Sequence, residues 1–177
     1  MARRVRRLFR GGRVVDLGGG HGLLAQAMLL LDDSSPEAIV VDTALPASAA
    51  RVHGAIVGAW PRLAGRVTLV DAALDAWAIA ATDVVVSSHA CGPLTDVILA
   101  RAAAARARVA VLPCCHDLPA GERSELAGWI DGALAIDVAR AMRLKQCGYR
   151  VWTQTIPADI TPKNRLLLGA PRALDPG

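Results

Sequence analysis

The sequence has 177 residues, 53% of them hydrophobic and 20% charged, so it can bury a core and does not have the composition of a disordered chain. It has no apolar run long enough to cross a bilayer, and no apolar segment follows its basic start, so we expect neither a membrane span nor a secretory signal. The net charge is +4, and the four cysteines have no export context, so we expect reduced thiols and a cytoplasmic location.

A basic segment occupies residues 1–13, before any predicted strand. Its cationic residues are Arg3, Arg4, Arg6, Arg7, Arg10 and Arg13. So many guanidinium groups in a short segment attract phosphates, which makes RNA an expected partner. A solvated basic tail is the alternative interpretation.

Short apolar runs and amphipathic stretches alternate along the rest of the chain. We predict strands over 14–17, 38–42, 66–71, 83–88, 108–113, 149–156 and 165–168, and helices over 23–31, 46–60, 96–106 and 122–147. Apolar strands that alternate with helices indicate a parallel sheet covered on both faces, and the last two strands should pair antiparallel. The predicted fold is α/β: a single domain over residues 1–177, Rossmann-like and three-layered, with a mostly parallel seven-stranded sheet and one antiparallel edge strand.

A glycine-rich loop follows the first predicted strand. It reads Asp16-Leu17-Gly18-Gly19-Gly20-His21-Gly22. Glycines let a ligand rest against bare backbone, and ligands of open α/β sheets bind at the carboxyl ends of the strands. Asp16 can hold an ammonium group or a bridging water, Asp42 can accept from two ribose hydroxyls, and Asp71 can accept from the exocyclic amine of adenine.

The spacing of this loop distinguishes two kinds of cofactor. Dinucleotide-binding loops have the pattern G-x-G-x-x-G and receive a pyrophosphate at the helix N-terminus. Here the pattern is G-x-G-x-G and a carboxylate precedes it, which repels phosphates and suits a ligand with an amine and a sulfonium. The loop therefore favours a sulfonium cofactor over a dinucleotide, and a purely structural loop in a non-enzyme is the remaining alternative.

This order of elements resembles the class I S-adenosylmethionine-dependent methyltransferases over residues 14–168. The resemblance implies S-adenosylmethionine as cofactor and S-adenosylhomocysteine as product. The residues it assigns to the cofactor are Asp16, Gly18, Gly19, Gly20, His21, Gly22, Asp42, Thr43, Asp71, Ala72 and Ser88.

A second group of reactive side chains follows the fourth and fifth predicted strands, whose carboxyl ends should converge. The candidate catalytic residues there are His89, Cys91, Asp96, Cys114, Cys115 and His116. They can supply a general base or shape the substrate site, they include soft ligands that suit zinc, or the thiols can simply pack behind the cofactor. Adjacent cysteines suit one tetrahedral ion poorly, so we assign no metal ligand.

The motifs His-Ala-Cys-Gly and Pro-Cys-Cys-His are similar to those of one methyltransferase subgroup. That subgroup includes the domain of a glutathione S-transferase C-terminal domain-containing protein with its bacterial relatives, and more distantly the tRNA 2′-O-methyltransferases. The tRNA enzymes have a lysine where Ser88 stands here, and a second histidine where Asp117 stands. We expect an S-adenosylmethionine-dependent methyltransferase acting on tRNA or rRNA. The alternatives are a small-molecule methyltransferase and a non-catalytic cofactor-binding or interaction module.

Overall fold

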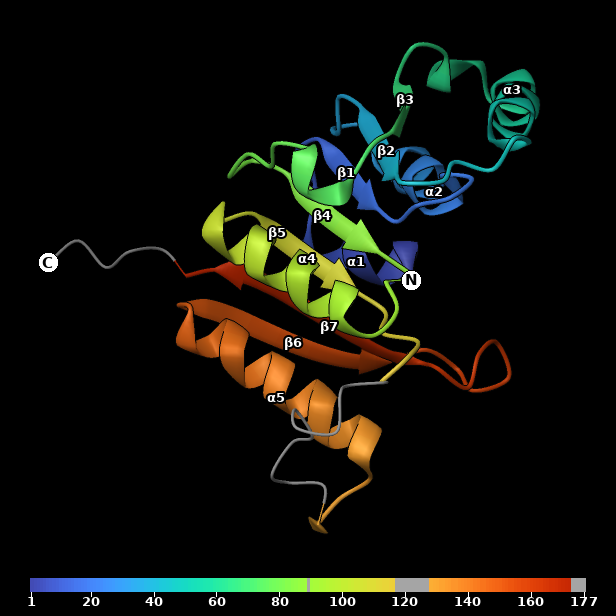
Figure 1. Ribbon diagram of the computed structural model, residues 1–177. Coiled ribbons are helices and arrows are strands. Elements are labelled where there is room, and N and C mark those ends of the chain that lie inside the picture. The colour runs from blue at the N-terminus through green and yellow to red at the C-terminus, as the bar shows by residue number, and fades with distance from the viewer. Residues whose placement is uncertain (89, 117–127, 173–177) are drawn as a thin grey trace, which may run out of the picture.

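The computed structural model describes residues 1–88, 90–116 and 128–172 (Figure 1). A seven-stranded sheet has the order β3-β2-β1-β4-β5-β7-β6. The strands are β1 (Val14–Leu17), β2 (Ala38–Asp42), β3 (Val67–Asp71), β4 (Val84–Ser87), β5 (Arg108–Val111), β6 (Tyr149–Thr155) and β7 (Arg165–Pro171). The helices are α1 (Ala2–Leu8), α2 (Leu23–Leu31), α3 (Ala49–Ala59), α4 (Pro93–Ala104) and α5 (Gly132–Gln146), with short 3₁₀ turns η1 (Pro61–Leu63) and η2 (Leu74–Ala76).

The sheet confirms the predicted mostly parallel architecture and shows where the reversed strand lies. Strands β1 to β5 pair in parallel, whereas β7 is antiparallel to both β5 and β6. The reversed strand is thus second from the edge, and β6 is outermost. Burial explains this order: residues 166–169 of β7 are all buried, whereas Tyr149 is the one buried residue of β6 and three of its seven residues are exposed, so β6 tolerates the edge.

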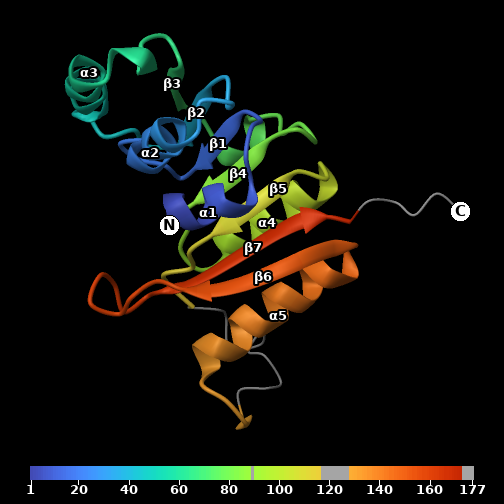
Figure 2. The same ribbon diagram turned by 180° about the vertical axis from the view of Figure 1, so that it is seen from behind.

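Helices cover both faces of the sheet, as predicted. Helices α1, α2 and α3 lie on one face and α4 and α5 on the other (Figures 1 and 2). Successive strand residues point to opposite faces, so Val84 belongs to the same core as Met28 of α2, whereas Val85 belongs to the core that contains Ile98 of α4. Each face has its own aliphatic core.

Helix α1 was not predicted. It is short, and its formation depends on Val5 and Phe9, which are four residues apart and therefore share one face. Both side chains are buried in the core that α1 shares with α2. The basic segment is therefore not a free tail, because its apolar face anchors it to the domain.

Two predicted helices begin later than the sequence indicated. Helix α3 begins at Ala49 rather than residue 46, and Pro46 lines a cavity instead. Helix α5 begins at Gly132, where the Asp131 side chain accepts from the Leu134 N–H as an N-cap. The predicted start at Glu122 lies outside the described residues. Within the described ranges, no helix is long and apolar enough to span a membrane.

Candidate functional site

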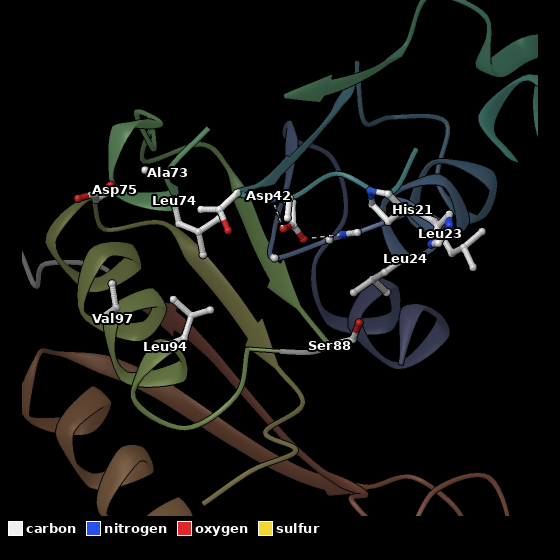
Figure 3. A pocket seen from close by; sticks show the side chains of 16 residues that line it. His21, Leu23, Leu24, Asp42, Ala73, Leu74, Asp75, Ser88, Leu94 and Val97 are labelled. Atoms are coloured by element: carbon white, nitrogen blue, oxygen red, sulfur yellow. Dashed lines mark hydrogen bonds between the residues drawn. The ribbon is translucent and has the colours of Figure 1, made fainter. Parts of the chain in front are cut away.

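A cavity of about 760 Å³ lies at the carboxyl edge of the sheet (Figure 3). It lies at the ends of β1 and β2, where the strand order reverses between β1 and β4. This switch point is where open α/β sheets bind their ligands. The lining residues are Gly18, Gly19, Gly20, His21, Leu23, Leu24, Asp42, Thr43, Ala44, Pro46, Ala73, Leu74, Asp75, Ser88, Leu94 and Val97.

The glycine loop presents bare backbone to this cavity. Gly18 and Gly20 have φ values of +69° and +53°, and a Cβ at either position would stand in open space. A Cβ on Gly19, by contrast, would come within 2.7 Å of Val40 Cγ1. The loop therefore packs tightly against β2 at Gly19 and leaves room for a ligand at Gly18 and Gly20.

Asp42 is held with its carboxylate at the cavity wall (Figure 3). Its Oδ2 accepts from the Gly20 N–H at 2.9 Å, and its Oδ1 accepts from the Ala44 N–H at 3.0 Å. Each carboxylate oxygen can accept more than one hydrogen bond. The two fixed oxygens can therefore still receive two neighbouring hydroxyl groups of a ligand.

Asp16 is fully buried beneath the glycine loop. Its Oδ2 accepts from the Ala25 N–H at 3.2 Å, and its buried Oδ1 has no partner among the described residues. Burial, assisted by the nearby charge of Asp42, raises the pKa of Asp16 to about 7. A buried carboxyl oxygen without a partner is a candidate acceptor for a ligand ammonium or a bridging water, although Asp16 itself does not line the cavity.

The predicted cofactor residues divide into those that line the cavity and those that do not. The first set is Gly18, Gly19, Gly20, His21, Asp42, Thr43 and Ser88. Asp16 and Gly22 lie outside this set, Gly22 as the N-cap of α2. Asp71 is exposed and Ala72 packs against the core.

Sequence reasoning missed part of the cavity wall. Ala73, Leu74 and Asp75, which follow the predicted pair Asp71 and Ala72, reach the cavity. Leu94 and Val97 of α4 add an apolar wall opposite Asp42 (Figure 3). Apolar helix residues of this kind give no sequence signal that separates a ligand wall from a core.

The cysteines of the second predicted group come together. Cys91 follows β4, and Cys114 and Cys115 follow β5, and their Sγ atoms all lie within 4.8 Å of one another. The Gly92 N–H donates to the Cys115 carbonyl at 3.3 Å and links the two loops. His89 lies outside the described residues.

His116 points into an ionic network rather than toward the thiols. Its Nε2 lies 3.0 Å from both Asp137 carboxylate oxygens, which requires a proton on Nε2 because a carboxylate only accepts. Its buried Nδ1 has no partner among the described residues. Asp137 also accepts from Arg165 Nε at 2.7 Å.

Arg140 connects this network to Asp96 and was not identified from the sequence. Its side chain is 1% exposed, donates to Asp96 Oδ2 at 2.7 Å and reaches Asp137 Oδ1 at 3.3 Å. It also donates to the Gly92 carbonyl at 2.9 Å. Asp96, predicted as catalytic, is therefore engaged by Arg140 and by the exposed Arg143, and the network supports the loop that holds Cys91.

The N-terminal arginines are not equivalent. Arg6 is 3% exposed and pairs with buried Asp32, and Arg13 forms a two-pronged bond with Asp83. Arg3 and Arg7 are exposed. Arg4 donates to Gln154 near the end of β6, which places the start of α1 at the carboxyl edge of the sheet, the same edge as the cavity.

These features define the chain as a Rossmann-like protein with a cofactor-sized cavity at the switch point of its sheet. A family model described as "Methyltransferase domain" matches residues 3–121, which is more than half of the chain. The chain belongs to this methyltransferase domain family.

Solved structures share the fold at low sequence identity. The pyocyanin biosynthetic protein PhzM is 20% identical with a TM-score of 0.62, and the alignment covers 97% of this chain and 54% of PhzM. A candidate RNA methyltransferase from Pyrococcus horikoshii is 16% identical with a TM-score of 0.61, covering 97% and 81%. An O-methyltransferase from neocarzinostatin biosynthesis, solved with S-adenosylmethionine and a naphthoic acid, is 24% identical with a TM-score of 0.57, covering 91% and 49%.

The chain spans about half the length of PhzM and of the neocarzinostatin enzyme. No curated protein matches the sequence.

Proposed function

We propose that this chain transfers a methyl group from S-adenosylmethionine to RNA. The observation that supports it most is the cavity lined by the glycine loop and by Asp42, whose two oxygens are fixed, at the switch point of a methyltransferase-family sheet. A structural neighbour with the same fold was solved with S-adenosylmethionine.

The residues of the cavity fit the parts of this cofactor. Asp42 would accept from the two ribose hydroxyls, and the open backbone at Gly18 and Gly20 would lie against the ribose and methionine. The unpaired Oδ1 of Asp16 would receive the methionine ammonium, directly or through water. Leu74 and Val97 offer an apolar surface for the adenine ring.

The cofactor supplies an activated methyl group on a sulfonium, which a nucleophile displaces in line. The protein's own contribution is alignment, since fixed contacts at Asp42 and the glycine loop limit the positions that the bound cofactor can take. On the other side of the sheet edge, Asp137 fixes the imidazole of His116 through Nε2, and His116 lines a smaller cavity with Lys163 and Arg165. We propose that His116 helps to shape the substrate side of the site from this smaller cavity.

The position of α1 favours RNA over a small molecule. Arg3 and Arg7 are exposed on a helix whose start lies at the same edge as the cavity, so their charges can contact a phosphate backbone while a nucleotide occupies the site. The candidate RNA methyltransferase of Pyrococcus horikoshii has the same fold, as do the small-molecule enzymes. The small-molecule alternative is therefore the competing outcome of the substrate test.

The cofactor half of the proposal is tested by calorimetry. We expect wild-type protein to bind S-adenosylhomocysteine with a micromolar dissociation constant and Asp42→Ala to bind far more weakly. Absence of binding to folded wild-type protein would refute enzymatic use of this cofactor and leave an interaction module.

The substrate half is tested with total RNA and methyl-labelled S-adenosylmethionine. We expect label in RNA with wild-type protein, and a loss of label with His116→Ala at unchanged cofactor affinity. RNA retention should fall steeply with salt and drop in the double variant Arg3→Ala/Arg7→Ala. The charge-matched control is Arg51→Ala/Arg172→Ala, which removes two exposed arginines elsewhere. Label in small molecules of a cell extract, with no RNA retention, would refute RNA as substrate.

A further inference from the structure

Three of the four cysteines form a compact thiol cluster, defined here as Cys91, Cys114 and Cys115. The Sγ atoms of Cys91 and Cys114 are 3.0 Å apart, and those of Cys114 and Cys115 are 3.8 Å apart. The cluster exists because β4 and β5 are parallel neighbours, so the loops that leave their carboxyl ends meet. Neither the family match nor the proposed methyl transfer assigns it a role.

The sulfur spacing matches one metal ion bound by several thiolates. Zinc–sulfur bonds of about 2.3 Å at tetrahedral angles separate the sulfurs by about 3.8 Å. Cys114 and Cys115 already have this separation, although they are adjacent in the sequence. Their adjacency was the reason that the sequence alone argued against a metal, and the observed loop conformation removes that objection. The pair Cys91 and Cys114 must open by less than about 1 Å to match.

The surroundings of the cluster select the kind of ion. Its three ligand atoms are all sulfur, and no carboxylate or histidine of the described residues belongs to it. Soft thiolates favour zinc or Cu(I) over magnesium and calcium. Cys91 is exposed and the other two cysteines are partly exposed, so an ion can enter and a water can complete a four-coordinate site.

We propose that Cys91, Cys114 and Cys115 bind one zinc ion through three thiolates, with water as the fourth ligand. The ion would tie the loop after β4 to the loop after β5, in addition to the bond between the Gly92 N–H and the Cys115 carbonyl. It would thereby fix the chain that follows Ser88, a residue of the cofactor cavity. Binding requires only that the three thiols lose their protons, and no oxidant takes part.

Metal analysis of the full chain tests this site without reference to activity. The protein is expressed without a polyhistidine tag and purified under reducing conditions, and its zinc content is measured by mass spectrometry. Stripped protein is then titrated with Co²⁺, whose sulfur-to-metal charge-transfer absorption reports thiolate ligands. We expect one ion per chain, and an affinity lowered by more than about tenfold in Cys114→Ser.

Cys147→Ser is the matched control, because Cys147 is an exposed free cysteine at the end of α5 and outside the cluster. It should bind zinc and cobalt like the wild type. Should Cys114→Ser fail to fold, Cys91→Ser provides the same test at an exposed position.

Zinc below about 0.2 per chain in saturated, reduced protein, with no cobalt charge-transfer band, would refute the site. Equal weakening by Cys147→Ser would refute the choice of ligands, and preferential loading with copper would refute zinc as the ion.

Discussion

Replacement of Asp16 by asparagine tests how the buried carboxyl beneath the glycine loop takes part in cofactor binding. In the free protein the pKa of Asp16 is raised to about 7, chiefly by burial and further by the charge of Asp42. If Asp16 holds the methionine ammonium, it must be ionised in the complex, and binding at acid pH must first remove its proton. Asparagine retains the shape and can still accept from the Ala25 N–H, but it does not titrate.

The size of the effect follows from this pKa. The proton weakens the apparent affinity by a factor of one plus the ratio of protonated to ionised Asp16. That factor is about 11 at pH 6 and about 1.1 at pH 8 for a pKa near 7, so the dissociation constant should rise about tenfold as the pH falls from 8 to 6. This change equals about 1.4 kcal/mol.

The assay is calorimetric titration with S-adenosylhomocysteine at pH 6, 7 and 8, for wild type and Asp16→Asn. The ligand's own titration affects both proteins alike, so the difference between their pH profiles isolates Asp16. We expect the tenfold rise in wild type only, with weaker binding of the variant at pH 8. Parallel profiles in the two proteins would show that Asp16 does not ionise on binding and would refute a direct bond to the ammonium.

Three further results are expected. The raised pKa of Asp16 means that the folded protein without ligand binds the Asp16 proton more tightly than the unfolded chain does. As the pH rises from 4 to 8, this group should therefore remove about 4 kcal/mol from the unfolding free energy of the wild type. The loss should be absent from Asp16→Asn, and urea denaturation measures it. Asp42→Ala should weaken cofactor binding about a hundredfold, because the ligand loses two hydrogen bonds to a charged acceptor. Asp71→Ala removes an exposed carboxyl outside the cavity and should change the affinity less than about threefold. Equal effects of the two variants would argue against the ribose contact. Arg140→Ala should destabilise the protein by about 3–5 kcal/mol, because it removes the buried cation that Asp96 and Asp137 share. Arg143→Ala, whose side chain is 70% exposed, should cost less than about 1 kcal/mol. Similar melting curves for the two variants would contradict the importance of burial here.

Local patterns in the sequence were enough to predict the strands and the glycine loop. Strands β1 and β2 and helix α2 have the predicted bounds. The reason is that an apolar run bounded by glycine, proline or acidic residues shows, from a few neighbouring positions, where the element begins and ends. The predicted meeting of the loops after β4 and β5 follows from the same local pattern, since parallel neighbours place their carboxyl ends together.

Contacts between distant segments decided the rest. Helix α1 forms because Val5 and Phe9 are buried in the core, where the ring centroids of Phe9 and Trp152 lie 5.8 Å apart in an edge-to-face contact. The seven residues of α1 alone do not predict this burial. Arg6 resembles its exposed neighbours in the sequence, yet it is buried against Asp32, 26 positions later.

The site shows the same division. The sequence by itself determined the fold class, the glycine loop that lines the cavity and the acid at Asp42, because these depend on short-range patterns and on the direction of parallel strands. Only the tertiary structure decided that Asp16 is buried with one oxygen unpaired and that Arg140 bridges Asp96 and Asp137. It also decided that the Sγ atoms of three cysteines lie within 4.8 Å of one another. Burial and ion pairing depend on which distant side chains arrive at a place, and a linear pattern does not record that.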